Sequence, residues 1–127
     1  MTANQIKIKE LKNIEDVISP GVQFCPGCTM ELIARVVLKL LGDDVLMFGA
    51  PSCAVFSNRG KFAYYGTLMT NIVSNATGVS RAFRRQGRDT ICLALAGDGA
   101  TADIGFGALS AAAERGERIL YICYDNE

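Results

Sequence analysis

The chain has 127 residues, half of them apolar, and its 13 basic and 13 acidic side chains give a formal net charge of zero. This length can build one domain with its own core, and the apolar share excludes an intrinsically disordered chain. The balanced charge argues against a nucleic-acid-binding or polybasic membrane-binding protein, because both need a basic surface.

The sequence has no segment typical of a membrane span or of a signal peptide, and this bears on where the protein is expected and on the state of its cysteines. No apolar run approaches the roughly 20 residues of a membrane span, and the polar N-terminus does not have the pattern of a signal peptide. We therefore expect a cytoplasmic protein. The cysteines form an odd set without an export signal, which argues against a disulfide framework; they are Cys25, Cys28, Cys53, Cys92 and Cys123. Histidine is absent, so any catalysis would have to work without the commonest general base or borrow it from a cofactor or a partner chain.

The first third of the chain predicts an arm followed by a helix. Residues 1–19 are polar with weak apolar spacing, and we expect an N-terminal arm, extended or briefly helical, that ends at Pro20 and Gly21. A helix is then expected from Thr29 to Leu41, with Gly42 as a stop signal. The apolar residues that recur there at helical spacing are Leu32, Ile33, Val36, Val37 and Leu40.

Strands and helices alternate in the rest of the chain. Apolar runs predict three strands, at Val45–Phe48, Thr90–Ala96 and Arg118–Tyr124, of which the last two are expected to be buried, Thr90–Ala96 on both faces. A loop is expected over Ala50–Lys61 and a helix over Thr70–Arg85. Asp103 has the character of an N-cap, which predicts a further helix over Ile104–Arg115 that is closed by Gly116.

This alternation predicts an α/β fold, a doubly wound and mainly parallel sheet with helices on both faces. We expect one domain over residues 20–127. Because the sequence ends directly after a strand, we also expect the domain to continue beyond Glu127 and the chain to be the N-terminal portion of a longer polypeptide. Ligands of such sheets bind at the carboxyl ends of the strands.

One of these strand ends carries residues suited to a diphosphate and a metal. Gly97 and Gly99 allow the backbone to turn and approach a ligand closely, and amides at the start of the next helix can point at phosphate oxygens. Asp98 offers a hard oxygen for Mg²⁺, and Asn126, at the end of the next strand, offers a second. Gly-Asp-Gly alone would be only a turn. The matching Asn one crossover later favours a site that binds magnesium and diphosphate.

The cysteines suggest a second site. Cys25 and Cys28 lie in a CPGC motif, and Cys53 follows the next predicted strand. From the residues alone, structural zinc and an iron–sulfur cluster are about equally compatible with three such thiols. A thioredoxin-like dithiol is disfavoured because the first strand follows the motif. Cys92 and Cys123 lie inside apolar strands, and we expect both to be core packing residues.

The segment GDGATADIGFGALSAAAERGERILYICYDNE resembles the thiamine-diphosphate motif, a Gly-Asp-Gly followed by a distant Asn. More narrowly, it resembles the β subunit of 2-oxoacid:ferredoxin oxidoreductases of the pyruvate type, from Cys25 onward. The resemblance implies oxidative decarboxylation of a 2-oxoacid with thiamine diphosphate and Mg²⁺, and electron transfer through a [4Fe–4S] cluster to ferredoxin. It also implies acyl transfer to coenzyme A, and activity only with partner subunits of the α and γ/δ type.

The resemblance assigns roles to particular residues. Cys25, Cys28 and Cys53 would hold the cluster, with a fourth Cys further downstream, and Asp98 and Asn126 would hold Mg²⁺. The residues expected around the cofactor are Gly97, Asp98, Gly99, Ala100, Asn126, Ser52, Cys53 and Asn71. No residue of this chain is expected to act as the catalytic acid or base, which the cofactor and a partner subunit would supply.

Departures from the family pattern leave the substrate open. Many relatives have a His before the CxxC motif and a Pro- and Trp-containing stretch after the third cysteine, whereas this chain has Phe24 before Cys25 and contains no Trp. Pyruvate is the first expectation, with oxalate, branched-chain and aromatic 2-oxoacids as alternatives. Two other readings are a thiamine-dependent decarboxylase or synthase without redox chemistry, and a zinc-stabilised interaction module without catalysis.

Overall fold

The structure, a computed structural model, describes residues 10–54 and 60–125. Four parallel strands form one sheet in the order β2-β1-β3-β4. The strands are β1 (Val45–Gly49), β2 (Ala63–Gly66), β3 (Ile91–Gly97) and β4 (Leu120–Tyr124). The helical elements are η1 (Glu10–Asn13), α1 (Thr29–Leu41), α2 (Ile72–Arg85), the π-helical turn η3 (Gly99–Asp103) and α3 (Phe106–Glu114).

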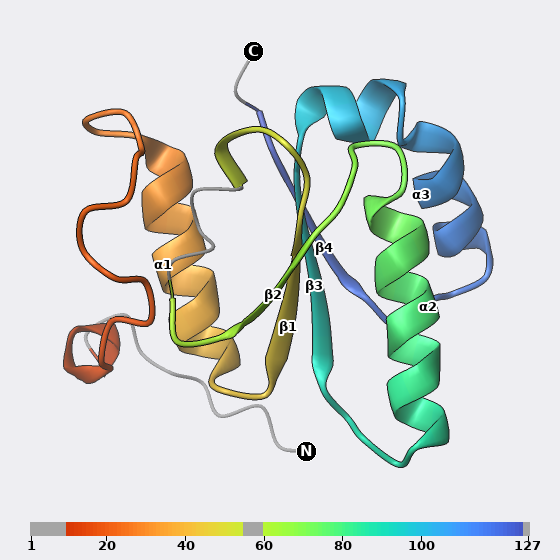
Figure 1. The fold of residues 1–127 in the computed structure, drawn as a ribbon, viewed down its shortest axis with the longest axis horizontal. Helices are drawn as coiled ribbons and strands as arrows, with labels where there is room; N and C mark the ends of the chain where they lie inside the picture. Colours follow the sequence, from red (N-terminus) through yellow and green to blue (C-terminus); the bar gives the residue numbers. More distant parts are fainter. Residues whose placement is uncertain (1–9, 55–59, 126–127) are drawn as a thin grey trace.

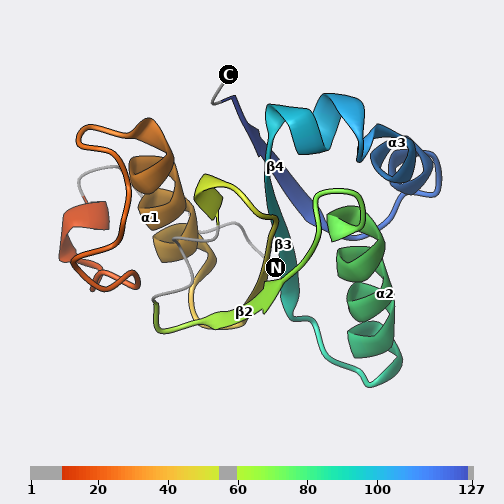
Figure 2. The ribbon, with the colours of Figure 1, turned by 45° about the horizontal axis from the view of Figure 1, so that its top comes forward.

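The sheet lies between two helical layers. Helix α1 covers one face, and α2 and α3 cover the other (Figures 1 and 2). This arrangement confirms the predicted α/β fold with helices on both faces. None of the helices in the described ranges has the length and apolar character needed to cross a membrane.

Alternation of side chains along the central strands divides the core in two. Met47 and Leu93 point to the α1 side, whereas Phe48 and Cys92 point to the α2 and α3 side, and all four are at most 1% exposed. Successive strand residues face opposite sides of a sheet, so the apolar runs of β1 and β3 contribute side chains to the core on both faces of the sheet. This confirms the prediction that the strand over Thr90–Ala96 is buried on both faces. The strand over Arg118–Tyr124 was also predicted to be buried, but β4 is mostly exposed or half-buried because it lies at the edge of the sheet.

Helix α1 has the predicted bounds, but a different face of it is buried. Of the apolar residues whose spacing predicted it, Leu32 is 63% exposed, Leu40 is 47% exposed, and none is fully buried. Met30, Ala34 and Leu38 recur at helical spacing and are buried against the sheet. Gly42 ends the helix with a φ of 74°, a left-handed conformation that favours glycine, and its amide donates to the Leu38 carbonyl at 3.1 Å. The predicted range of this helix, Thr29 to Leu41, is therefore confirmed.

The segment before the CPGC motif is anchored to the domain. Ile18 is 1% exposed and belongs to the core on the α1 side. The Arg35 guanidinium donates to the Ile18 carbonyl at 2.7 Å and forms an ion pair with Asp16 at 2.8 Å. Ile18 also pairs with Gly60 in an antiparallel bridge. Residues 16–18 are thus part of the folded body.

Three further sequence predictions need correction. Strand β2 was not predicted; it is a short, largely exposed edge strand without a clear apolar pattern. Asp103 is not an N-cap, because the chain is already helical from Asp98 onward, and α3 begins only at Phe106 after Gly105. Cys123 is exposed on β4, which lies at the edge of the sheet, so it is not a core residue, whereas Cys92 is buried as predicted.

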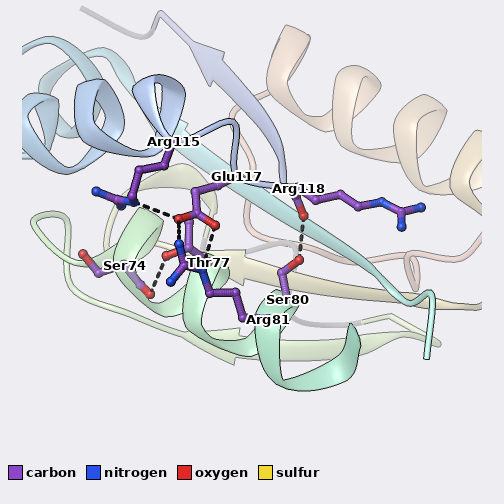
Figure 3. A network of polar contacts seen from close by, with 7 residues as sticks. All are labelled: Ser74, Thr77, Ser80, Arg81, Arg115, Glu117 and Arg118. Carbon is purple, nitrogen blue, oxygen red and sulfur yellow. Dashed lines mark hydrogen bonds and ion pairs between the residues drawn. The ribbon is translucent and has the colours of Figure 1, made fainter. Parts of the chain in front are cut away.

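A polar network fastens α2 to the connection between α3 and β4 at the amino end of the sheet (Figure 3). The Glu117 carboxylate accepts hydrogen bonds from Arg81 (Nε at 3.0 Å) and Arg115 (Nε at 2.8 Å). These bonds hold the pKa of Glu117 below its usual value. Nearby, the Ser80 hydroxyl donates to the Arg118 carbonyl at 2.6 Å. Glu117 with its two arginines, and Ser80 with Arg118, therefore join α2 to the segment just before β4.

Candidate functional site

The candidate site lies at the carboxyl edge of the sheet, at the top of Figure 1. Gly49 ends β1 opposite Leu95, and Gly97 ends β3 opposite Tyr124 at the end of β4. Because the three strands are parallel, the segments that follow them leave the sheet at the same edge. These segments carry Ser52, Cys53, Asp98 and Asp125, together with Asn126, which lies outside the described residues.

The segment after β3 turns directly into a helix. Asp98 has helical backbone angles (φ −56°, ψ −45°), and the π-helical turn η3 follows, with the Ile104 amide donating to the Gly99 carbonyl at 3.2 Å. The first amides of a helix have no partner within it, so the amides that follow Gly97 can bind an anion. Gly99 lies inside the turn and has no left-handed conformation. The conformation of Gly99 therefore does not require glycine, contrary to the role that the sequence analysis gave it.

Gly105 holds the turn closed, and the sequence analysis did not identify it. A Cβ at this position would lie 2.0 Å from the Ala100 carbonyl oxygen and 3.1 Å from that of Met69. Only a residue without a side chain allows this approach. The sequence signal for this role is weak: Gly105 stands between the turn and the apolar helix α3.

Two hydroxyls brace the same turn from the α3 side of the sheet. The Thr101 hydroxyl donates to the Gly97 carbonyl at 2.7 Å and lies 2.9 Å from the Tyr121 hydroxyl. Burial raises the pKa of Tyr121, so this hydroxyl stays protonated at neutral pH. The backbone around Asp98 is therefore fixed by contacts within the chain before any ligand binds.

The chemistry of this segment fits a metal–diphosphate ligand. Asp98 is partly exposed, offers a carboxylate oxygen of the kind Mg²⁺ prefers, and stands at the start of a helix whose amides suit phosphate oxygens. Its predicted partner Asn126 lies outside the described residues. The magnesium role of Asn126 thus stays a prediction from the sequence.

The CPGC motif forms a tight turn in front of α1. The Cys28 amide donates to the Cys25 carbonyl at 3.0 Å, and Gly27 has a φ of 76°. Pro followed by a left-handed Gly at the two central positions is the pattern of a type II turn. The turn brings the two cysteines close together at the N-terminus of the helix.

The three cysteines predicted as cluster ligands line one depression of about 450 Å³ at this edge. Its other walls include Cys123, Tyr124 and Asp125. In the described ranges, no three Cys, Asp or Glu side chains are grouped so that they could hold one metal ion. A [4Fe–4S] cluster asks for less convergence, because each iron takes its own thiolate. The lining of this depression is thus compatible with the predicted cluster ligands, and their role stays a prediction from the sequence.

Tyr124 connects the cysteine depression to the diphosphate segment, and the sequence analysis missed it. It is 4% exposed, and its hydroxyl accepts a hydrogen bond from the Ala54 amide at 3.1 Å. Ser52 also hydrogen-bonds to it through its side chain. Burial raises the pKa of Tyr124, and the nearby Cys53 and Asp98 side chains add to the increase. The ring thus lies within electrostatic reach of both parts of the site.

The remaining predicted residues have local roles. Ser52 has a φ of 149°, which non-glycine residues rarely adopt and which often accompanies a functional loop. The Asn71 side-chain oxygen accepts from the Leu68 amide at 3.0 Å, next to the start of α2. Ala100 is buried beneath the turn. Tyr64, beside Gly49, has a buried hydroxyl without a hydrogen-bond partner among the described residues.

Comparison with known proteins gives a family match and several relatives. The family described as "Thiamine pyrophosphate enzyme, C-terminal TPP binding domain" matches residues 48–127. The chain is 38% identical to the NADH-dependent phenylglyoxylate dehydrogenase subunit beta of Aromatoleum evansii, over 93% of this chain and 28% of that protein. It is also 38% identical to the pyruvate synthase subunit PorB of Methanothermobacter thermautotrophicus, over 89% of this chain and 42% of the relative.

A solved structure has the same fold. The 2-oxoglutarate:ferredoxin oxidoreductase of Magnetococcus marinus matches with a TM-score of 0.73 at 20% identity, over 97% of this chain and 43% of that chain. The chain thus spans less than half the length of each of these three proteins. The relatives confirm the resemblance to β subunits of 2-oxoacid oxidoreductases that the sequence motifs indicated.

Proposed function

This chain belongs to the thiamine pyrophosphate enzymes, in the family of their C-terminal TPP-binding domain, and we propose that it is the cofactor-binding part of a 2-oxoacid:ferredoxin oxidoreductase β subunit. The observation that supports the proposal is that the candidate diphosphate segment and the cysteine depression lie next to each other at the carboxyl ends of the strands. The helical start at Asp98 and the depression lined by Cys25, Cys28 and Cys53 meet at Tyr124.

The residues divide the work of the proposed site. Amides at the start of η3 bind the diphosphate, and Asp98 holds Mg²⁺ together with Asn126. Cys25, Cys28 and Cys53 hold three corners of a [4Fe–4S] cluster. Bound thiamine diphosphate supplies the electron sink that decarboxylation of a 2-oxoacid requires. Since the chain has no His, proton transfers use the cofactor and a partner subunit.

Substrate and electron acceptor are the finer parts of the proposal. Pyruvate is the first candidate, with acyl transfer to coenzyme A and electron transfer to ferredoxin. An aromatic 2-oxoacid is the second, because the relative named for phenylglyoxylate is as similar in sequence as the pyruvate synthase subunit of Methanothermobacter thermautotrophicus. The former relative is named NADH-dependent, so the assay should offer both ferredoxin and NAD⁺ as acceptors.

Two alternatives make different predictions. A thiamine-dependent decarboxylase or synthase without redox chemistry would contain no iron. A zinc-stabilised interaction module would contain zinc and show no response to thiamine diphosphate. The family match over residues 48–127 disfavours this last alternative.

The test uses the full-length β subunit, purified anaerobically with its partner subunits. We expect bound iron, and a rise in melting temperature on addition of thiamine diphosphate and Mg²⁺. Asp98→Asn removes the charge at the metal and should weaken Mg²⁺-dependent cofactor binding about 100-fold while leaving the iron content unchanged. Cys53→Ser should lower the iron content and leave cofactor binding in place. A wild-type complex without iron, or cofactor binding that is unaffected by Asp98→Asn, would refute the proposal.

A further inference from the structure

One side chain at the carboxyl ends of the strands, Tyr124, lies beside both the segment that carries Asp98 and the cysteine depression. Tyr124 is the last residue of β4 and pairs with Gly97, immediately before Asp98. Its ring lines the cysteine depression, and its hydroxyl reaches across to the loop after β1, where it accepts the Ala54 amide. That loop and β4 are 70 residues apart in the sequence.

The hydrogen bond to Ala54 cannot be replaced by water without a change of structure. Ala54 is 0% exposed, so its amide would lose its acceptor in a dry environment if the Tyr124 hydroxyl were removed. A buried donor without an acceptor is costly, and the backbone would have to move to satisfy it. The residue that would move with Ala54 is its neighbour Cys53.

We propose that Tyr124 is a positioning residue, which sets the place of Cys53 relative to the diphosphate segment and thereby the spacing between cluster and cofactor. The inference rests on the proposed function, because it assumes that Cys53 holds iron. The strand end fixes the ring, the ring fixes the Ala54 amide, and the amide fixes the cysteine. Hydroxyl dipoles and spacing around a cluster also tune its reduction potential.

The chain offers a matched control on the same strand. Tyr121 also has a hydrogen-bonded hydroxyl and is half-buried, but it bonds to Thr101 on the other face of the sheet. Tyr121→Phe and Tyr124→Phe therefore remove the same atom from β4 and disturb different sides of the site. A third variant, Tyr65→Phe, removes a hydroxyl from a residue that is 51% exposed on the edge strand β2 and reports any general effect of the substitution.

The experiment compares these variants in the anaerobically purified full-length complex. In Tyr124→Phe we expect hydrogen exchange at the Ala54 amide to accelerate about fivefold and iron release to a chelator to become faster. The midpoint potential of the cluster should shift as well. Tyr121→Phe and Tyr65→Phe should keep wild-type values in all three measurements.

The outcomes separate this inference from the proposed function. Equal exchange at Ala54 in Tyr124→Phe and Tyr121→Phe would overturn the positioning role. A faster Ala54 amide with an unchanged potential and unchanged iron release would overturn it too, because the bond would then be structural only. A wild-type complex that binds no iron refutes the proposed function itself, and it does so before any variant is compared.

Discussion

The two ends of the sheet use their polar residues differently. At the amino end, charged side chains pair with one another, as in Glu117 with Arg81 and Arg115, and Asp89 with Arg118 at 2.7 Å. At the carboxyl end, side chains brace backbone groups, as in Tyr124 with Ala54 and Thr101 with Gly97. Among the described residues, Asp98 has no cation as a partner.

This difference suggests that the polar residues at the amino end hold the fold together, whereas those at the carboxyl end are suited to bind a ligand. A carboxylate that is already bound to two guanidiniums cannot also hold a metal, whereas one without a cation beside it can. Neutral bonds from Thr101 and Tyr124 fix the backbone of the site and leave Asp98 without a cation beside it among the described residues. Perturbing the carboxyl end should therefore affect ligand binding, and perturbing the amino end should affect stability alone.

The largest effect is expected from Gly105→Ala. The new Cβ would lie 2.0 Å from the Ala100 carbonyl oxygen, so the turn must open. We expect a loss of about 3 kcal/mol in unfolding free energy and loss of thiamine diphosphate binding, measured by denaturant unfolding and calorimetric titration of the full-length complex.

Gly107→Ala is the matched control for this prediction. A Cβ at Gly107 meets no atom within 4 Å, and the position lies inside α3. Alanine should stabilise the helix by about 0.5–1 kcal/mol and preserve cofactor affinity. If both variants behaved alike, the close approach at Gly105 would have no role.

A smaller effect is expected from Thr101→Val, which keeps the shape of the side chain and removes its hydroxyl. The Gly97 carbonyl and the Tyr121 hydroxyl each lose a partner, and the dissociation constant for thiamine diphosphate should rise about tenfold. Thr90→Val is the counterpart at the amino end, where the hydroxyl accepts a long hydrogen bond from Arg88 at 3.3 Å. It should leave the affinity unchanged, and an equal loss in both variants would contradict the division between the two ends.

The smallest effect is expected from Glu117→Gln, and it should depend on pH. The folded-state pKa of Glu117 is lowered by hydrogen bonds from Arg81 and Arg115, so its contribution is fully present above the ordinary value of 4.5 and is lost as pH falls through the lowered pKa. The variant should therefore melt slightly below the wild type at pH 7 and approach it in acid, with cofactor affinity unchanged. A constant difference across pH would exclude the ionised carboxylate as the cause.

Prediction from the sequence succeeded where a local pattern determines the structure. The ends of α1 were predicted correctly, with Gly42 as its stop, although the buried face was not the predicted one. The apolar runs gave β1 and β3, because burial on both faces leaves a direct record in residue order. The Gly-Asp-Gly segment was placed correctly at a strand end. The cysteines at 25, 28 and 53 do line one depression.

The predictions failed where contacts between distant parts of the chain, and not a local pattern, determine the structure. Strand β2 is held by pairing with β1, not by its own pattern, and an exposed edge strand need not be apolar. Cys123 has an apolar sequence context but lies at the sheet edge. Tyr124 and Gly105 act through residues distant in sequence or through backbone atoms. No periodicity records such contacts, so only the fold reveals them.

The π-helical turn has a consequence for the rotational phase of the following helix. Such a turn amounts to one residue inserted into an α-helix, and each residue rotates the helix by about 100°. Ala112 on α3 is 3% exposed and belongs to the core, and we expect this extra residue to contribute to the rotation that turns it inward. Deleting one residue from 99–103 would make the start regularly α-helical and turn Ala112 away from the sheet. The length of the segment between Asp98 and β4 is therefore constrained by geometry as well as by chemistry.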